Sequence, residues 1–170
     1  MDISSLDHHK KKVNLEALDL ENLFSEVAKT MTDKAHDHGI HFTAEDVPDN
    51  CMSVWADKEH LKQSLIKLVY NGIKYNTPEG TVKLTAESGT NNLIRINVTD
   101  TGIGIPDSKI DRLFSPFDRL DAERETPDIQ GTGLGLTLAH KLITSMKGSI
   151  SVSSKPGQGT RFTIELTRAS

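Results

Sequence analysis

Apolar residues recur at two different spacings along this chain, and the order of the two spacings constrains its fold. Helical spacing, with apolar residues three or four apart, occurs over about 20–38, 57–75 and 134–146. The alternation typical of strands occurs over 40–44, 52–56, 81–87, 93–99, 149–153 and 161–166. Pairs of strands between helices predict an α+β fold with two layers, in which the helices cover one face of a mixed sheet.

The predicted elements are separated by residues that favour helix ends and turns. Gly39 is placed to end the first helix, and Asp57 is placed to cap the start of the second. Residues 76–78, Asn-Thr-Pro, stop that second helix. The turn residues 89–92 and 156–159 indicate that the last four strands form two hairpins.

The length of 170 residues suits a single domain with one hydrophobic core. Residues 1–18 are polar with few apolar anchors, so we predict a linker there and a domain over 19–170. The stretch 107–130 is also polar and is interrupted by Pro116 and Pro127. A connection of that length in a compact domain usually has a function, so we predict a lid over about 107–130.

The composition excludes several classes of protein. Cys51 is the only cysteine, which rules out an internal disulfide and fits a reducing compartment. No apolar run approaches the ~18 residues of a membrane span, and the first residues lack the apolar stretch of a signal peptide. The net charge of −4 gives no sign of a nucleic-acid surface. We therefore expect a cytoplasmic domain that contacts neither nucleic acid nor a membrane.

The segment Asp100–Pro106 follows directly on the strand 93–99 and contains two glycines. Gly102 and Gly104 can adopt backbone angles closed to other residues and allow a flat ligand to come close. Asp100 is an acceptor with little around it to neutralise its charge, and an adenine amino group is one natural partner. Taken alone, the segment fits a plain tight turn with an aspartate at its start equally well.

A second glycine-rich segment, Gly131–Leu136, opens the predicted helix 134–146. Backbone N–H groups at a helix start attract anions, and the helix dipole adds to that attraction. The segment lacks the Gly-Lys-Ser/Thr of the Walker pattern. It also departs from the dinucleotide fingerprint, because its third glycine comes one residue early. By itself it supports a nucleotide only weakly.

The predicted helix 57–75 has a polar face as well as an apolar one. Four residues at positions i, i+4, i+7 and i+8 share the polar face: Lys67, Asn71, Lys74 and Tyr75. An amide beside an ammonium group suits a magnesium ion and a polyphosphate. For this helix alone, a solvated polar face is the simpler interpretation.

Together these segments resemble the GHKL superfamily of ATPases and kinases, and within it the catalytic ATP-binding domain of sensor histidine kinases. The resemblance runs from about Leu15 to Leu166. It implies the Bergerat-type ATP-binding fold, with ATP and Mg²⁺ as cofactors. The matching motifs, in chain order, are Val54–Asp57, the asparagine box Asn71–Tyr75, the first glycine box Asp100–Pro106, the phenylalanine box Leu113–Phe117, the second glycine box Gly131–Leu136, and Gly157–Phe162.

The resemblance also implies a role for each matching residue. Asn71 would hold magnesium, Lys74 would approach the phosphates, and Asp100 would bind the adenine amino group. The glycines of the second glycine box would hinge the lid and offer amides to the phosphates. The full ATP-binding set implied is Asn71, Lys74, Tyr75, Asp100, Gly102, Gly104, Arg119, Arg124, Gly131, Thr132, Gly133, Leu134, Gly135 and Thr160.

One motif of histidine kinases does not occur in the chain, namely the phosphoacceptor histidine followed by an acidic residue. The resemblance therefore implies a domain that donates the γ-phosphate of Mg-ATP to a histidine on a dimerisation domain outside the chain. A response regulator would act downstream. Residues 1–18 would be the end of the dimerisation helix and a linker.

Two departures from the family pattern leave alternatives open. Lys67 stands where many members have an asparagine, and Gly72 replaces a common alanine. A nucleotide-sensing module without catalysis is one alternative. A hydrolytic ATPase of the gyrase or chaperone branch is less favoured, because those enzymes place a glutamate at the position of Lys67.

Overall fold

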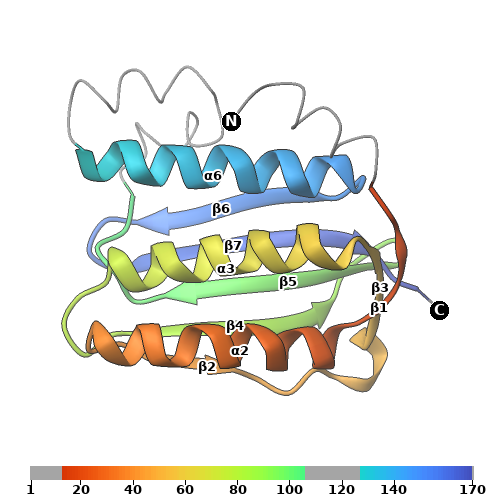
Figure 1. Ribbon diagram of the computed structural model, residues 1–170, viewed down its shortest axis with the longest axis horizontal. Coiled ribbons are helices and arrows are strands. Elements are labelled where there is room, and N and C mark those ends of the chain that lie inside the picture. Colours follow the sequence, from red (N-terminus) through yellow and green to blue (C-terminus); the bar gives the residue numbers. More distant parts are fainter. Residues whose placement is uncertain (1–12, 106–126, 170) are drawn as a thin grey trace.

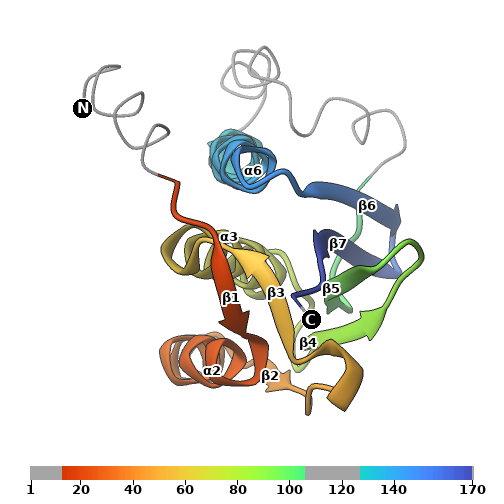
Figure 2. The ribbon, with the colours of Figure 1, turned by 90° about the vertical axis from the view of Figure 1, so that its right-hand side faces the viewer.

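A five-stranded sheet covered on one face by three helices forms the body of the molecule (Figures 1 and 2). The computed structural model describes residues 13–105 and 127–169, and only the backbone of 127–135. The helices are α2 (Leu20–Asp37), α3 (Lys58–Lys74) and α6 (Pro127–Ser145). This arrangement confirms the predicted two-layer α+β fold. Within the described residues, no helix is long and apolar enough to cross a membrane.

The strands of the main sheet lie in the order β2-β4-β5-β7-β6. β4 and β5 form one predicted hairpin, and β6 and β7 form the other. β2 pairs with β4 in parallel, so the sheet is mixed as expected. The bounds are β2 (His41–Ala44), β4 (Thr81–Ser88), β5 (Leu93–Asp100), β6 (Ser149–Lys155) and β7 (Gly159–Thr167).

A separate two-stranded sheet joins β1 (Glu16–Asp19) to β3 (Ser53–Ala56). The predicted boundary between residues 18 and 19 falls inside β1, and the side chain of Leu18 is buried in the core. A four-residue strand with one inward apolar side chain has too little alternation to be recognised from sequence. Residues 1–12, predicted as a helix end and linker, lie outside the described part of the chain.

The core lies between the helices and the sheet, and its helical members are those that the periodicity predicts. The buried stripe of α2 consists of Leu20, Leu23, Phe24, Val27, Met31 and Ala35. The stripe of α3 consists of Leu61, Leu65, Leu68, Val69 and Ile73. Burying one such aliphatic side chain contributes about 1.5–3 kcal/mol, so these two stripes supply much of the force that fixes both helices on the sheet.

The start of α3 is tied to two distant segments through Asp57, which caps the helix as predicted. One carboxylate oxygen accepts the N–H of His60 at 3.1 Å, and the other accepts the N–H of Asn14 at 2.9 Å. The N–H of Asp57 donates to the sulfur of Met146 at 3.2 Å. Burial raises the pKa of the Asp57 carboxyl, but the hydrogen bonds from Asn14 and His60 outweigh it and hold that pKa below its usual value.

Helix α6 begins earlier than the glycine pattern predicts. The sequence favours a start near residue 134, whereas the helix runs from Pro127, so the second glycine box lies inside it. Proline has a fixed φ that suits a first helical turn and needs no partner for an N–H. Packing of the buried residues Leu136, Ala139 and Ile143 stabilises the rest of the helix, which ends at Ser145.

Candidate functional site

Three predicted segments meet at one end of the molecule, where α3 and β5 both end (Figure 1, left). Asp100 is the last residue of β5, and its register partner on β7 is Thr160. Gly72 of α3 faces Asp100 so closely that an added Cβ would lie 3.4 Å from a carboxylate oxygen. The structure thus brings the asparagine box, the first glycine box and Thr160 together.

Asp100 presents a carboxylate in an environment that opposes its charge. Burial raises the pKa of Asp100 to about 6, while hydrogen bonds from the backbone N–H groups of Gly102 and Thr160 oppose that rise. The bond from Gly102 is 2.8 Å long. A carboxylate held by two amides and little solvent is a strong acceptor for an amino group of a ligand.

The turn after Asp100 is clamped between α3 and the β6–β7 hairpin. The N–H of Ile103 donates to the carbonyl of Tyr75 at 3.1 Å, and the carbonyl of Ile103 accepts from Gly157 at 2.7 Å. Gly104 has φ +78°, and a Cβ there would lie 2.2 Å from the carbonyl oxygen of Lys155. The close approach that Gly104 permits in this structure is therefore to the protein's own backbone.

Asn76 joins the end of α3 to the turn and to β4, and sequence reasoning assigned it no site role. Its Oδ1 accepts from the N–H of Thr77 at 2.7 Å and from the hydroxyl of Thr101 at 3.2 Å. Its Nδ2 donates to the carbonyl of Thr81 at 3.0 Å. The sequence marks Asn76 only as a helix stop, because the partners at Thr81 and Thr101 depend on the fold.

We expect Asn76→Ala to destabilise the domain by about 1–2 kcal/mol, because it removes three hydrogen bonds at a partly exposed position. At ~2–4 °C per kcal/mol, the melting temperature should fall by about 2–8 °C. Thermal unfolding measures this. Asn22→Ala, on the exposed face of α2, is the matched control, and an equal melting temperature for both variants would contradict the expectation.

Thr160 is buried in a second network that sequence reasoning only partly found. Its hydroxyl lies 2.8 Å from the hydroxyl of Ser154. The Ser154 oxygen accepts from the N–H of Ile105 at 2.8 Å, and its hydroxyl donates to the carbonyl of Gly159 at 2.9 Å. Ser154 therefore fixes the far end of the glycine turn against the last hairpin.

The polar face of α3 presents donors at this end of the molecule. The Nδ2 atom of Asn71 is buried and has no hydrogen-bond partner among the described residues. The ammonium of Lys74 lies 5.3 Å from the centre of the Tyr75 ring. A buried amide donor without a partner requires an acceptor oxygen from elsewhere, and a phosphate group supplies such oxygens.

These residues fit a nucleoside triphosphate: Asp100 offers an acceptor for the base, and α3 offers donors for phosphates. They also fit a magnesium ion held mainly by phosphates, since the Asn71 Oδ1 is a hard oxygen ligand. Among residues 13–105 and 127–169, no group of three or more His, Cys, Asp or Glu side chains could hold a metal by itself.

Part of the predicted site lies outside the described residues. This holds for Arg119, Arg124, the phenylalanine box and most of the lid 107–130. Of the second glycine box, only the backbone is described, so Gly131, Gly133 and Gly135 are placed in α6 while the side chains of Thr132 and Leu134 are not. The roles implied for these residues remain predictions.

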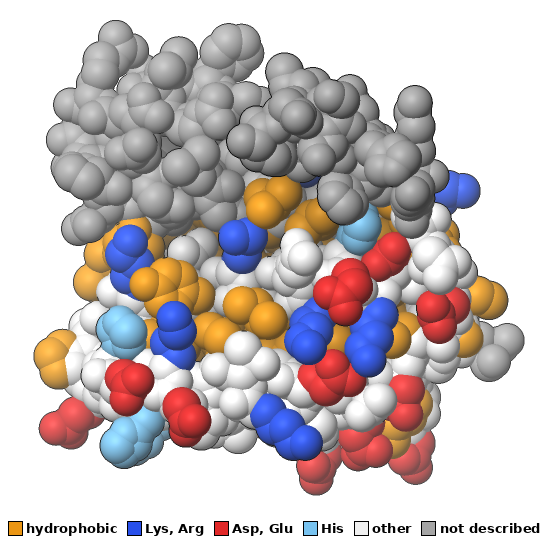
Figure 3. All heavy atoms as spheres, viewed as in Figure 1, with side chains coloured by type: hydrophobic (Ala, Val, Ile, Leu, Met, Phe, Trp, Pro, Cys, Tyr) orange, Lys and Arg blue, Asp and Glu red, His pale blue; other side chains and the backbone are white. Residues whose placement is uncertain are grey.

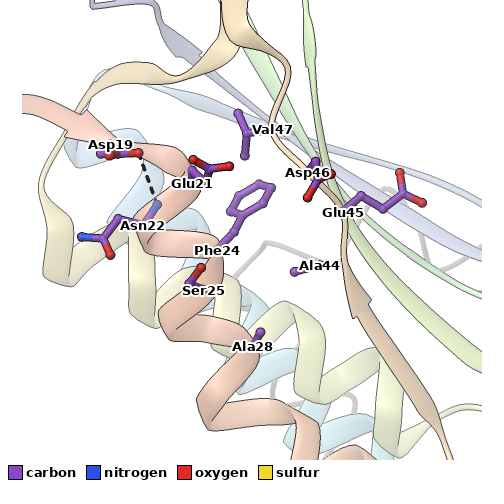
Figure 4. Close-up of a pocket in the computed structure, with 10 residues that line it drawn as sticks. All are labelled: Asp19, Glu21, Asn22, Phe24, Ser25, Ala28, Ala44, Glu45, Asp46 and Val47. Carbon is purple, nitrogen blue, oxygen red and sulfur yellow. Dashed lines mark hydrogen bonds between the residues drawn. The ribbon is translucent and has the colours of Figure 1, made fainter.

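A pocket of about 470 Å³ elsewhere on the molecule is a poor alternative site (Figure 4). It lies between the start of α2 and the segment after β2, and four carboxylate residues line it: Asp19, Glu21, Glu45 and Asp46. Acidic side chains also gather on the lower right of the helical face (Figure 3). Their charge would repel a polyphosphate, so the glycine-turn end remains the candidate site.

Residues 56–170 match the family described as "Histidine kinase-, DNA gyrase B-, and HSP90-like ATPase". The match covers more than half of the chain, which therefore belongs to this family. The fold and the site described above thus define an ATP-binding domain.

The individual relatives narrow the class to histidine kinases. The chain is 36% identical to the signal transduction histidine-protein kinase BarA of Escherichia coli K12, over 95% of this chain and 18% of BarA. The catalytic domain of histidine kinase ThkA, nucleotide-free, is 30% identical with a TM-score of 0.75, over 91% of this chain and 96% of that one. Full-length ShkA in complex with AMPPNP is 31% identical with a TM-score of 0.78, over 94% of this chain and 32% of that one. The chain is the ATP-binding catalytic domain of a sensor histidine kinase.

The chain spans between 17% and 36% of the length of the curated relatives considered, for example 18% of BarA. Histidine kinase ThkA has also been solved in complex with the response regulator protein TrrA. These likenesses confirm the resemblance and the fold class predicted from the sequence.

Proposed function

We propose that this domain binds Mg-ATP and donates its γ-phosphate to a histidine on a dimerisation domain outside the chain. One observation carries the proposal. The acceptor Asp100 faces Gly72, and the unpartnered donor Asn71 is the residue that precedes Gly72 in α3, at the same end of the fold. This pairing offers one group to an adenine base and the other to phosphates.

The residues of the chain would act mainly by positioning. Asp100 would orient the base through its amino group, and the α3 donors Asn71 and Lys74 would hold the phosphates. A magnesium ion, ligated by the Asn71 oxygen and the phosphates, would supply charge neutralisation. Phosphoryl transfer needs chiefly such positioning and electrostatic stabilisation, so a nucleophile from another domain would complete the site.

The polar face of α3 disfavours hydrolysis as the main reaction. A general base that activates water needs a carboxylate near the γ-phosphate. Glu59 is the only acidic residue of α3, and it lies in the first turn, at the end opposite to Asn71. Lys67, one turn before Asn71, is a cation and cannot serve as that base.

Two partners follow from this function. The first is a histidine-bearing dimerisation domain of the same full-length protein. The second is a response regulator that receives the phosphoryl group, and its support is the complex of the related ThkA with TrrA.

We expect the domain alone not to phosphorylate itself, and to label a separate histidine-bearing domain added in trans. The chain's own His8 and His9 are followed by Lys10 and lack an acidic neighbour to help remove the imidazole proton. The measurement is incubation with γ-labelled ATP and magnesium, with and without the dimerisation domain of a close relative, followed by acid treatment. Phosphohistidine is acid-labile, so true transfer gives a label that acid removes.

Two results would count against the proposed reaction. Acid-labile label on the domain alone, lost when His8 and His9 are replaced, would show autophosphorylation. Intact ATP binding without transfer to any histidine domain would favour the nucleotide-sensing module instead. Asp100→Asn serves as the negative control, because it should reduce labelling in parallel with its weaker ATP binding.

A further inference from the structure

We propose that Lys67 binds the polyphosphate directly and makes nucleotide binding by this domain largely independent of a divalent cation. The inference rests on the proposed function and concerns the same site. It assigns a role to the one residue of the α3 polar face for which the family pattern supplies none.

Lys67 lies on the same face of α3 as Asn71 and Lys74. At 100° per residue, Asn71 is displaced from Lys67 by about 40° around the helix axis, and Lys74 by about 20° in the other direction. Lys67 is therefore flanked on one face by the two residues that carry the proposed phosphate contacts. One helical turn separates Lys67 from Asn71, so their Cβ atoms lie about 5–6 Å apart.

The charge of Lys67 is not neutralised by the described part of the protein. The other lysines of α3 have partners there: Lys58 and Lys62 pair with Glu26 of α2 at 2.9 and 3.1 Å, and Lys74 lies over the ring of Tyr75. For Lys67, which is half-buried, no ion pair or hydrogen bond with residues 13–105 or 127–169 is recorded.

The neighbouring amide shows what kind of ligand this face takes. The buried Nδ2 of Asn71 has no acceptor among the described residues. The ammonium of Lys67, on the same face, is a second donor without an ion pair in that part of the chain. Two donors one turn apart, without a carboxylate between them on α3, match an oxyanion with several oxygens. A polyphosphate has this chemistry, and the lysine charge would weaken, without preventing, the binding of a magnesium ion at the neighbouring Asn71 oxygen.

Lys67 and a magnesium ion would thus perform the same task and oppose each other. Both neutralise phosphate oxygens, and like charges near one another weaken each other's binding. By linkage, the factor by which magnesium strengthens ATP binding should therefore be small in the native domain and larger without the lysine charge.

The test measures the dissociation constant of ATP by calorimetry in excess Mg²⁺ and in EDTA, for the native domain and for Lys67→Asn. For the native domain, we expect the dissociation constants of ATP in Mg²⁺ and in EDTA to differ by less than about 5-fold. Lys67→Asn should lose about 10- to 100-fold in EDTA, the loss of one charged hydrogen bond, and much less in Mg²⁺. Lys67→Arg, which keeps the charge, should restore binding in EDTA.

Two controls separate this effect from general charge and from misfolding. Lys58→Asn removes the same charge from α3 about 14 Å along the helix, beyond the ~8 Å screening length at physiological salt, and should leave the Mg²⁺/EDTA ratio unchanged. AMP, which lacks the outer phosphates, should bind Lys67→Asn and the native domain equally. Equal AMP affinities would also show that Lys67→Asn leaves the adenine-binding part of the site folded.

Each other outcome overturns the inference. An Mg²⁺/EDTA ratio that Lys67→Asn leaves unchanged within 2-fold would show that Lys67 does not contact the polyphosphate. A native domain that binds ATP only with Mg²⁺ would show that the lysine does not replace the ion. If the native domain binds no nucleotide in either condition, the proposed function itself is wrong. The first two outcomes would overturn only the role of Lys67 and leave the proposed function intact.

Discussion

Asp100→Asn is expected to weaken ATP binding by about 10- to 150-fold and, at neutral pH, to stabilise the folded domain. The affinity falls because the variant removes the charged acceptor for the adenine amino group, a hydrogen bond worth about 1.5–3 kcal/mol. The stability rises because burial disfavours the ionised carboxyl of Asp100, whose pKa is raised from 3.8 to about 6. At 1.36 kcal/mol per pH unit, this cost is at most roughly 3 kcal/mol, and an asparagine does not carry it.

The pH dependence follows from the same shift in the pKa of Asp100. Between pH 3.8 and about 6, the folded domain holds a proton that the unfolded chain has lost. This group therefore lowers the free energy of unfolding as pH rises through that window, and the full cost is present above it. The stabilisation by Asp100→Asn should be about 1–3 kcal/mol at pH 8 and should disappear near pH 4.

Urea unfolding at pH 4 and pH 8, with calorimetric titration of ATP at pH 8, measures both effects. Asp33→Asn, an exposed change on α2, controls for the altered net charge. The ATP affinity of the native domain should also increase as pH rises through about 6, since only the ionised carboxyl is the full acceptor. A variant with native ATP affinity would refute the assigned role, and equal stability at pH 8 would refute the burial cost.

Gly104→Ala should destabilise the domain more than Gly157→Ala, although the two glycines have the same positive φ. At Gly104, the φ of +78° costs an alanine about 1–2 kcal/mol. The new Cβ would also lie 2.2 Å from the carbonyl oxygen of Lys155, which forces the backbone to move and adds about 1–3 kcal/mol. The expected total is about 2–5 kcal/mol, a fall in melting temperature of ~4–20 °C.

Gly157→Ala is a closely matched control for this prediction. Gly157 has the same φ of +78°, but nothing lies within 4 Å of a Cβ placed there. Its substitution should therefore cost only the backbone component, about 1–2 kcal/mol. Thermal unfolding of the two variants isolates the close approach of Gly104 to Lys155, and equal melting temperatures would show that the turn can move away without cost.

Much of the fold was predictable because the spacing of apolar residues in a long stripe indicates whether the segment is a helix or a strand. The stripe of α2 and the two hairpins have the lengths and turns that make periodicity unambiguous. The pairing of β1 with β3 was not predictable, because Leu18 is the only buried residue of β1 and the strand therefore shows no alternation. The early start of α6 was missed because the glycines of the second glycine box were interpreted as a turn that leads into the helix, and glycine has a low helix propensity.

The candidate site likewise contains residues that could be predicted from the sequence and residues that could not. Asp100 and Asn71 could be found because a short motif surrounds each of them, and in the structure Asp100 faces Gly72, the residue after Asn71. Asn76 and Ser154 could not, because their functions depend on hydrogen bonds to residues that only the folded chain brings near. Local pattern thus identifies the groups offered to a ligand, whereas the residues that hold those groups in position require the structure.

The capping of α3 by Asp57 has a mechanical consequence. Tension on the backbone at Val13 reaches the carboxylate of Asp57 through the N–H of Asn14, one residue further along. From Asp57 it passes into the first turn of a rod about 26 Å long, whose opposite end carries Asn71 and Lys74. A pull or twist on the backbone at Val13 would therefore act on one end of a continuous helix whose other end carries the side chains of Asn71 and Lys74.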